Sequence, residues 1–314
     1  MTRIRILLLC LGLSLALPAS GQYRDYYIYG KVVDTSQKPL EGVEIKLRDA
    51  ATSRSFTLKT NANGEFKFVG LPHGVYTVIY KKDGYAPKQD EWKFEKVQEV
   101  MRKTEIPTII LISQERVKEI EGLKEMEAEV KQAKDKIEQR DFEGAIDLCR
   151  KVLDRNPKDP NALYLLGIGY SRKGRWAEAV EALTQVTLLI PNFPPAYFEL
   201  AVNYQRLDDP SRALAAYQKN MELDAANADS AYNAGLILFG SGNIDQALPL
   251  FEKALSLRPS DPEFLEMAGR CYINRADYAK AIDSLEKAKA GSTNPEKIKF
   301  LEDLIGKLKE QIKK

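Results

Sequence analysis

The chain repeats itself at a step of 34 residues between Met126 and Thr293, and this period constrains its fold more than any other feature. One position of the repeat is small in every unit: Ala133, Gly167, Ala201, Gly235 and Gly269. Another position is always alanine, and a residue able to pack follows it four positions later. A period in this range indicates a solenoid, in which each unit buries its apolar face only against its neighbours.

The repeats resemble tetratricopeptide repeats, and this resemblance implies that each unit is a pair of helices. In the second unit the residues that carry the resemblance are Leu163, Leu166, Gly167, Tyr170, Gly174, Ala179, Leu183 and Pro191. We assign five repeats over 126–293, with the units 126–159, 160–193, 194–227, 228–261 and 262–293. The first unit departs from the family pattern, because Lys136 stands where tyrosine is usual.

Helical segments are expected on both sides of the repeats. Ser113 is a candidate N-cap for a linker helix over 113–125, in which Gly122 could mark a bend or a break. Asn294 can cap a last helix over 294–314, where Pro295 suits the first turn. We interpret this last helix as the cap of the solenoid, with dimerisation as the alternative.

The sequence pattern of residues 22–112 predicts a small antiparallel β-sandwich. Short runs of β-branched and aromatic residues, such as Tyr26–Val33 and Val75–Tyr80, alternate with turn signals such as Asn61-Ala62-Asn63-Gly64. The last strand is expected over Ile106–Ile112, and another around Trp92–Phe94. The fold class is therefore multidomain, a small antiparallel β-sandwich followed by an all-α tetratricopeptide-repeat solenoid.

The order of motifs in this segment resembles the carboxypeptidase regulatory-like domain, a transthyretin-like sandwich. The resemblance is carried by Gly30-Lys31-Val32-Val33-Asp34, Pro39-Leu40-Glu41-Gly42-Val43, Gly70-Leu71-Pro72-His73-Gly74 and Gly84-Tyr85. It implies a fold but no chemistry, because this module accompanies catalytic domains without reacting itself.

The first 21 residues are typical of a secretory signal peptide. Arg3 and Arg5 precede an apolar run from Ile6 to Leu17, and small residues follow, so cleavage is expected after Gly21 or Ala19. The run is shorter than the roughly 20 residues of a membrane-spanning helix. We therefore expect an exported protein with no transmembrane segment after cleavage. The combination of the two resembled modules implies the periplasm or cell envelope of a bacterium, with secretion as the alternative.

Charge and residue usage argue against several classes of function. The leader holds two of the 47 basic residues and none of the 45 acidic ones, which leaves 45 of each sign and disfavours nucleic acid as a partner. Cys149 and Cys271 lie in different repeats and are expected to be buried free thiols. His73 is the only histidine, so a zinc peptidase or a Ser-His-Asp site lacks its residues. We expect no enzyme activity, no metal and no cofactor.

The tetratricopeptide resemblance also implies a binding groove, lined by the first helix of each unit. At the fifth, ninth and thirteenth positions of the middle units stand Tyr164, Ile168, Arg172, Phe198, Val202, Arg206, Tyr232 and Leu236. The first unit places Val130 and Lys134 at the fifth and ninth positions, and the last unit places Glu266 and Arg270 there. The apolar ninth positions replace the asparagine frequent in groove-binding relatives, and favour an amphipathic helix or apolar peptide, including one of this chain's own helices.

These observations predict a non-catalytic scaffold or adaptor that binds a protein or peptide partner through the repeat groove. The alternative is a carbohydrate- or envelope-binding structural protein that acts through the β-sandwich. In that case Tyr26, Tyr27, Tyr29, Tyr80, Tyr85 and Trp92 are the candidates for stacking on sugars.

Overall fold

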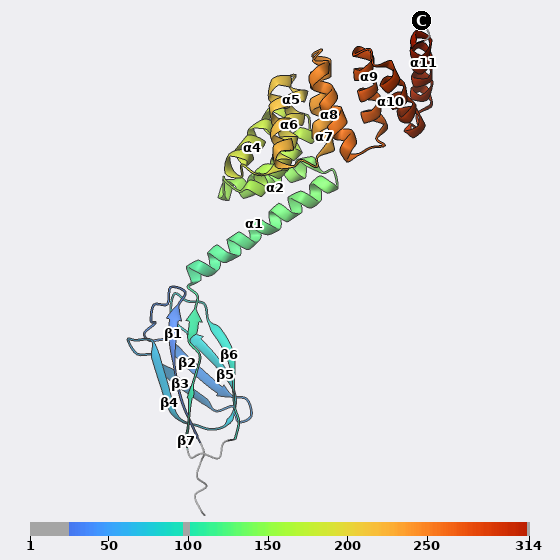
Figure 1. Ribbon diagram of the computed structural model, residues 1–314. Helices are drawn as coiled ribbons and strands as arrows, with labels where there is room; N and C mark the ends of the chain where they lie inside the picture. The colour runs from blue at the N-terminus through green and yellow to red at the C-terminus, as the bar shows by residue number, and fades with distance from the viewer. Residues whose placement is uncertain (1–24, 97–100, 313–314) are drawn as a thin grey trace, which may run out of the picture. The chain divides into compact units, whose positions relative to one another are not determined.

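The structure, a computed structural model, describes residues 25–96 and 101–312 (Figure 1). The predicted leader lies outside these residues. The described chain divides into two compact units, which meet in the sequence between Leu123 and Lys124. Among the described residues, no helix combines the length and the apolar composition that crossing a lipid bilayer requires.

The first unit is the predicted sandwich of two sheets (Figure 1). One sheet contains β1 (Asp25–Asp34), β4 (Glu65–Leu71), β7 (Met101–Glu105) and β8 (Ile109–Leu111). The other has the order β3 (Ser55–Lys59), β2 (Glu44–Asp49), β5 (Gly74–Lys81) and β6 (Lys88–Phe94). The core lies between the sheets and includes buried Ile28, Leu47, Tyr76 and Tyr80.

The sheets are mainly antiparallel, as expected, but two strand pairs differ from that expectation. β7 and β8 are both parallel to β1, and they pair with successive parts of it, at Asp25–Tyr29 and at Val32–Asp34. The last strand, expected over Ile106–Ile112, is shorter and covers only Ile109–Leu111. The strand expected around Trp92 begins earlier, at Lys88.

One long helix, α1 (Gln114–Glu138), follows the sandwich. The predicted cap is confirmed, because the Arg116 amide donates to the Ser113 hydroxyl over 3.2 Å. The helix has no break at Gly122 or after residue 125, so the segment expected as a linker and the first helix of the first repeat are one helix.

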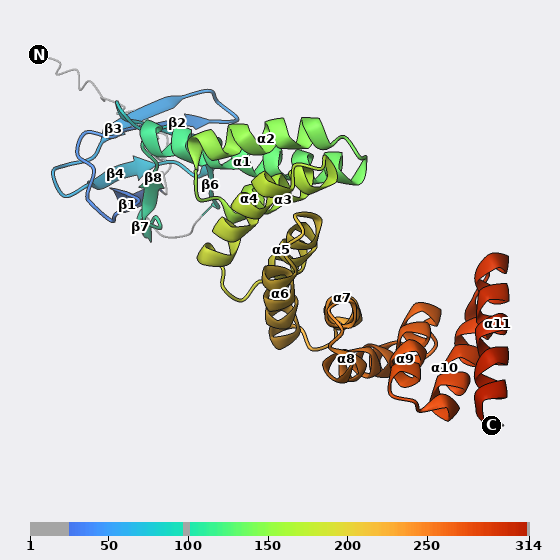
Figure 2. The ribbon, with the colours of Figure 1, turned by 90° about the horizontal axis from the view of Figure 1, so that it is seen from above.

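The second unit contains helix pairs with the predicted period. The remaining helices are α2 (Phe142–Arg155), α3 (Pro160–Arg172), α4 (Trp176–Leu189), α5 (Pro194–Arg206), α6 (Pro210–Leu223), α7 (Ala228–Gly240), α8 (Ile244–Leu257), α9 (Pro262–Asn274), α10 (Tyr278–Gly291) and α11 (Pro295–Ile312). In Figure 2 the pairs succeed one another in chain order along this unit. The solenoid fold predicted from the repeats is confirmed.

Local sequence explains where these helices begin and turn. Side chains cap several of them, such as Asp159, which accepts from the Ala162 amide over 2.9 Å, and Asn294, which accepts from the Glu296 amide over 2.9 Å. Between the two helices of each unit one residue has a left-handed backbone, and these residues again repeat every 34 positions: Arg140, Gly174, Asp208, Gly242 and Ala276. Glycine adopts this conformation without strain, whereas the other three residues do so at a cost.

The small position of the repeat faces the large residue that follows the invariant alanine by four positions, as the units with glycine at the small position show. A Cβ atom added to Gly167 would come within 2.6 Å of the Leu183 side chain, and one added to Gly235 within 2.8 Å of Phe251. The small residue thus lets the second helix approach closely, and the large residue fills the space between helices. Cys149 and Cys271 are buried and free, as expected. Burial raises the pKa of Cys149 to about 12 and that of Cys271 to about 11.

Candidate functional site

The residues predicted to line the groove lie on three successive first helices, α3, α5 and α7. Their spacing of four residues places them on one face of each helix. The six apolar and aromatic side chains are each half-buried, and the two arginines are exposed. Their position and burial do not identify a ligand, so the role of these eight residues in binding stays a prediction.

An open apolar cavity of about 550 Å³ lies between α1 and α3. Val130 and Ile137 line it from α1, and Tyr164 and Ile168 line it from α3. Phe193 closes one side, with its ring 5.1 Å from that of Tyr164 at an interplanar angle of 81°. The cavity therefore contains the fifth-position residues of the first two units, together with the ninth-position Ile168 of the second.

Charged side chains also line this cavity. Lys131 and Lys134 contribute ammonium groups, and Glu127 and Glu138 contribute carboxylates. An apolar floor with a charged rim suits the apolar face of an amphipathic segment, whose polar face then meets the rim. The sequence analysis placed Val130 and Lys134 at groove positions but did not show that α1 closes a cavity against α3.

The aromatic groove residues are partly used by the fold itself. The Phe198 ring lies 5.9 Å from the ring of Tyr217 on α6, and the Tyr232 ring stacks on that of Phe264 on α9 at 4.6 Å. Burial, with the nearby charge of Glu199, raises the pKa of Tyr164 to about 12. Tyr164 is therefore neutral near pH 7, and the rings of Phe198 and Tyr232 contribute to the packing between helices.

The two arginines differ in their partners. The Arg172 guanidinium lies 3.2 Å from the carboxylate of Glu199 on the next first helix, and Glu199 is only 9% exposed. The Arg172 side chain is 45% exposed, so solvent screens the attraction between the two charges. Arg206, by contrast, has no carboxylate within 4 Å among the described residues. Of these two arginines, only Arg206 therefore lacks an ion-pair partner among the described residues.

The last unit replaces the apolar pattern by a charged cluster. The Glu266 carboxylate lies 2.7 Å from the Arg270 guanidinium and 2.8 Å from the Lys297 ammonium of α11. Burial acts to raise the pKa of Glu266, but hydrogen bonds from Lys297 and Arg270 outweigh it and lower that pKa below its usual value. The fifth-position residue of the last unit thus holds α11 against α9, and the apolar row ends at α7.

A second open cavity, of about 860 Å³, lies on the outer surface of the sandwich. It contains Tyr27 and Tyr29 of the six aromatic residues expected as sugar-stacking candidates. Tyr26, Tyr80 and Trp92 are buried in the core, and Tyr85 packs against that core. Burial therefore excludes Tyr26, Tyr80 and Trp92 from an outer binding surface, whereas Tyr85 is half-buried.

Comparison with known families agrees with both resemblances. Residues 27–101 match the model of the carboxypeptidase regulatory-like domain. Two tetratricopeptide repeat models match residues 136–203 and 232–295.

Two relatives each match less than half of this chain. The chain is 22% identical over 141 residues to "Anaphase-promoting complex subunit 3" of Schizosaccharomyces pombe, which covers 45% of this chain and 21% of that protein. It is 26% identical over 133 residues to "Hsp70-Hsp90 organizing protein 3" of Arabidopsis thaliana, which covers 42% of this chain and 22% of that protein. The match thus spans about a fifth of the length of each relative.

Solved structures show the same fold for the repeats. The crystal structure of the MamA protein superposes with a TM-score of 0.50 at 26% identity, covering 53% of this chain and 91% of that one. YrrB, described as a TPR protein with an unusual peptide-binding site, superposes with a TM-score of 0.50 at 20% identity, covering 56% of this chain and 90% of that one. The second likeness concerns the fold alone.

Proposed function

We propose that this chain, which joins a carboxypeptidase regulatory-like domain to tetratricopeptide repeats, is a non-catalytic scaffold that binds a segment of a partner protein. The observation that carries the proposal is the apolar cavity between α1 and α3, at residues that the repeat pattern assigns to the groove. The names of two relatives, "Hsp70-Hsp90 organizing protein 3" and "Anaphase-promoting complex subunit 3", support the same class of function.

The proposed ligand is an amphipathic helix or an apolar peptide of the partner. Its apolar side chains occupy the cavity and contact Ile168, Val202 and Leu236, which are half-exposed. An acidic group of the partner pairs with Arg206, because Arg172 already pairs with Glu199. An apolar contact surface supplies affinity, and the charge sets the orientation of the segment.

We also propose that the protein is exported and acts in the bacterial periplasm or cell envelope, or outside the cell. The support for export is the leader pattern of residues 1–21, and the support for a bacterial envelope is the combination of the two modules. N-terminal sequencing of the protein from its native host is expected to begin at Gln22 or at Ser20. A cytoplasmic protein that retains Met1 contradicts the proposal.

The binding proposal is tested by introducing charge into the groove. Ile168→Glu and Val202→Glu each place a carboxylate on a half-exposed apolar position, which disfavours an apolar ligand face. Leu188→Glu is the matched control, because Leu188 on α4 is 76% exposed and is not a groove position. Proteins captured from envelope extract by the full chain and by each variant are compared by quantitative mass spectrometry.

The expected result is a partner that the unchanged chain and the Leu188→Glu variant capture equally, and that both groove variants lose. The partner's binding segment, made as a peptide, is then expected to bind the purified chain. A control peptide of unrelated sequence is expected not to displace it. Circular dichroism establishes that the variants remain helical. Equal capture by all three variants places the partner elsewhere and contradicts the proposed groove.

A further inference from the structure

The outer face of the sheet formed by β4, β1 and β7 has an unusual combination of side chains. Side chains alternate along a strand, and the core takes Tyr26, Ile28 and Val32 of β1. The opposite face of β1 therefore carries Tyr27 and Tyr29, and Lys31 follows them.

The strand register places charged residues beside these tyrosines. On β4, Lys67 lies opposite Tyr29. On β7, Lys103 lies opposite Tyr27 and Glu105 lies opposite Tyr29. The two aromatic rings in the central strand are thus flanked by Lys67 on one side and by Lys103 and Glu105 on the other.

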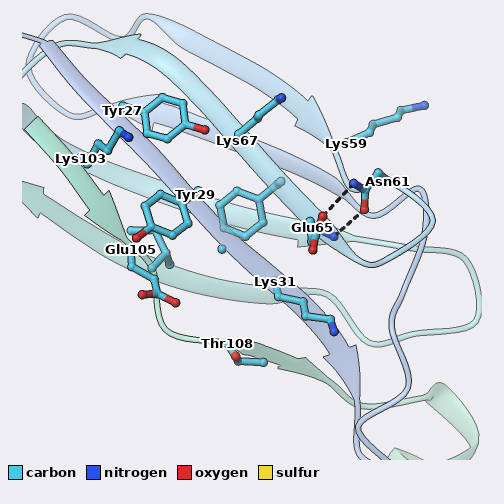
Figure 3. A pocket seen from close by; sticks show the side chains of 13 residues that line it. Tyr27, Tyr29, Lys31, Lys59, Asn61, Glu65, Lys67, Lys103, Glu105 and Thr108 are labelled. Carbon is cyan, nitrogen blue, oxygen red and sulfur yellow. Dashed lines mark hydrogen bonds between the residues drawn. The ribbon is translucent and has the colours of Figure 1, made fainter. Parts of the chain in front are cut away.

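These residues line the open cavity of about 860 Å³ (Figure 3). The rings of Tyr27 and Tyr29 lie side by side, with centroids 5.9 Å apart, and Tyr29 is 37% exposed. The Lys103 ammonium lies 5.8 Å from the centre of the Tyr27 ring. At the rim, the Asn61 amide donates to the Glu65 carboxylate over 3.2 Å, which fixes the turn before β4.

The side chains that line this cavity carry a net positive charge. Four lysines line it, against two glutamates: Lys31, Lys59, Lys67 and Lys103, with Glu65 and Glu105. In the described parts of the chain, none of these four ammonium groups has a carboxylate oxygen within 4 Å. Each can therefore form a charge-assisted hydrogen bond with an anion without first losing another partner.

We propose that this face of the sandwich binds an acidic saccharide, one whose sugar units carry carboxylate groups. The apolar face of a sugar ring packs on Tyr27 and Tyr29, and lysine ammonium groups bind the sugar carboxylates. Glu65 and Glu105 accept hydrogen bonds from sugar hydroxyls, which a purely anionic ligand does not offer. This site is separate from the groove of the repeats and does not depend on it.

Two other classes of polymer fit the face less well. The backbone groups of β1, the central strand, are already paired with β4 and β7, so an acidic peptide that lies across Tyr27 and Tyr29 finds side chains there and no main-chain partners. A single-stranded nucleic acid stacks on aromatic rings and needs a continuous basic track, which Glu65 and Glu105 interrupt.

The test uses the full chain and four polymer probes. These are polygalacturonate, which is a carboxylated saccharide, pullulan, which is uncharged, poly-L-glutamate and an oligo-thymidine single strand. Affinity is measured by biolayer interferometry at low and at moderate salt, because pairs between exposed charges are screened by salt. The expected order is polygalacturonate first, with each other probe weaker by about tenfold or more, as loss of a hydrogen bond to a charged group predicts.

Two double variants test the residues. Tyr27→Ala with Tyr29→Ala, and Lys67→Ala with Lys103→Ala, are each expected to weaken polygalacturonate binding by about tenfold or more. The matched control removes two lysines from the outer face of the other sheet, Lys46→Ala with Lys81→Ala, and is expected to leave binding unchanged. The variant Lys67→Ala with Lys103→Ala changes exposed side chains only, so it tests the site even if the tyrosine variant is less stable.

Three results overturn the proposal. The first is no binding of polygalacturonate to the full chain. The second is equal or tighter binding of poly-L-glutamate or of the oligo-thymidine strand, since this assigns the face to another class of polymer. The third is unchanged polygalacturonate affinity in both double variants, while their melting temperatures match that of the control.

Discussion

Gly167→Ala is expected to destabilise the solenoid, although alanine normally stabilises a helix. Gly167 lies inside α3, where exchanging glycine for alanine alone contributes about 0.5–1 kcal/mol in favour of folding. The new Cβ atom, however, comes within 2.6 Å of Leu183 Cγ and 2.9 Å of Leu183 Cδ2, and within 3.4 Å of the Ala179 carbonyl oxygen.

The Leu183 side chain has little room to move away, because it is 0% exposed. Overpacking of this kind costs about 1–3 kcal/mol, and two contacts below 3.0 Å favour the upper part of that range. The expected net effect is a loss of about 1–2 kcal/mol. For a unit of this size that corresponds to a melting temperature lower by roughly 2–8 °C.

Gly306→Ala is the matched control. Gly306 also lies inside a helix, α11, but a Cβ atom there meets nothing within 4 Å. This variant is expected to be more stable than the unchanged chain by about 0.5–1 kcal/mol. Both variants are compared in urea and thermal unfolding followed by far-ultraviolet circular dichroism. If Gly167→Ala stabilises the protein as much as Gly306→Ala does, the close approach of the two helices is refuted.

Three further predictions concern the turns, the last unit and the thiols. Ala276 and Gly174 both have a left-handed backbone, which glycine adopts more easily than alanine. Ala276→Gly is therefore expected to raise the free energy of unfolding by up to about 1 kcal/mol, and Gly174→Ala to lower it by about 1–2 kcal/mol. Thermal unfolding of the two variants is expected to show changes of opposite sign. Glu266 has a lowered pKa, so its ionised form stabilises the fold above the unfolded pKa of about 4.5, and this contribution is lost as the pH falls through the folded value. The stability difference between the unchanged chain and Glu266→Gln is thus expected to shrink between about pH 5 and pH 3, and a constant difference contradicts it. Cys149 and Cys271 are expected to resist alkylation until the protein unfolds, as peptide mass spectrometry can measure; rapid labelling of the native chain argues against their burial.

The repeat architecture could be predicted from the sequence because its signals are local and periodic. Four first helices begin at the residues that open the assigned units, Pro160, Pro194, Ala228 and Pro262. The facing of Gly167 and Leu183 follows from one period applied to two positions. The five-fold recurrence of each signal made these predictions independent of any single residue.

The sandwich was harder to predict where its pairing joins distant parts of the chain. After Met101, β7 contains only charged and polar residues, and it forms a strand because β1 pairs with it in parallel across more than 70 positions of sequence. Similarly, the alternation Tyr26-Tyr27-Ile28-Tyr29 sorts these residues onto two faces, but only the opposite sheet determines which face becomes the core.

The candidate site shows the same limit. The sequence assigned Arg172 and Arg206 equivalent roles, since both stand at the thirteenth position of a unit. The structure separates them, because Glu199 on the next first helix neutralises one and not the other. A contact between helices of different units depends on the stacking of those units, and the pattern within one unit does not contain it.

The central claim, that a partner binds in the groove of the first helices, is tested most directly by site-specific crosslinking. A photoreactive amino acid is placed at Val202 on α5, or at Gln218 on α6, which is exposed and is not a groove position. The partner captured by the unchanged chain is expected to crosslink from position 202 and not from position 218. Crosslinking from position 218 alone would contradict the groove as the binding surface.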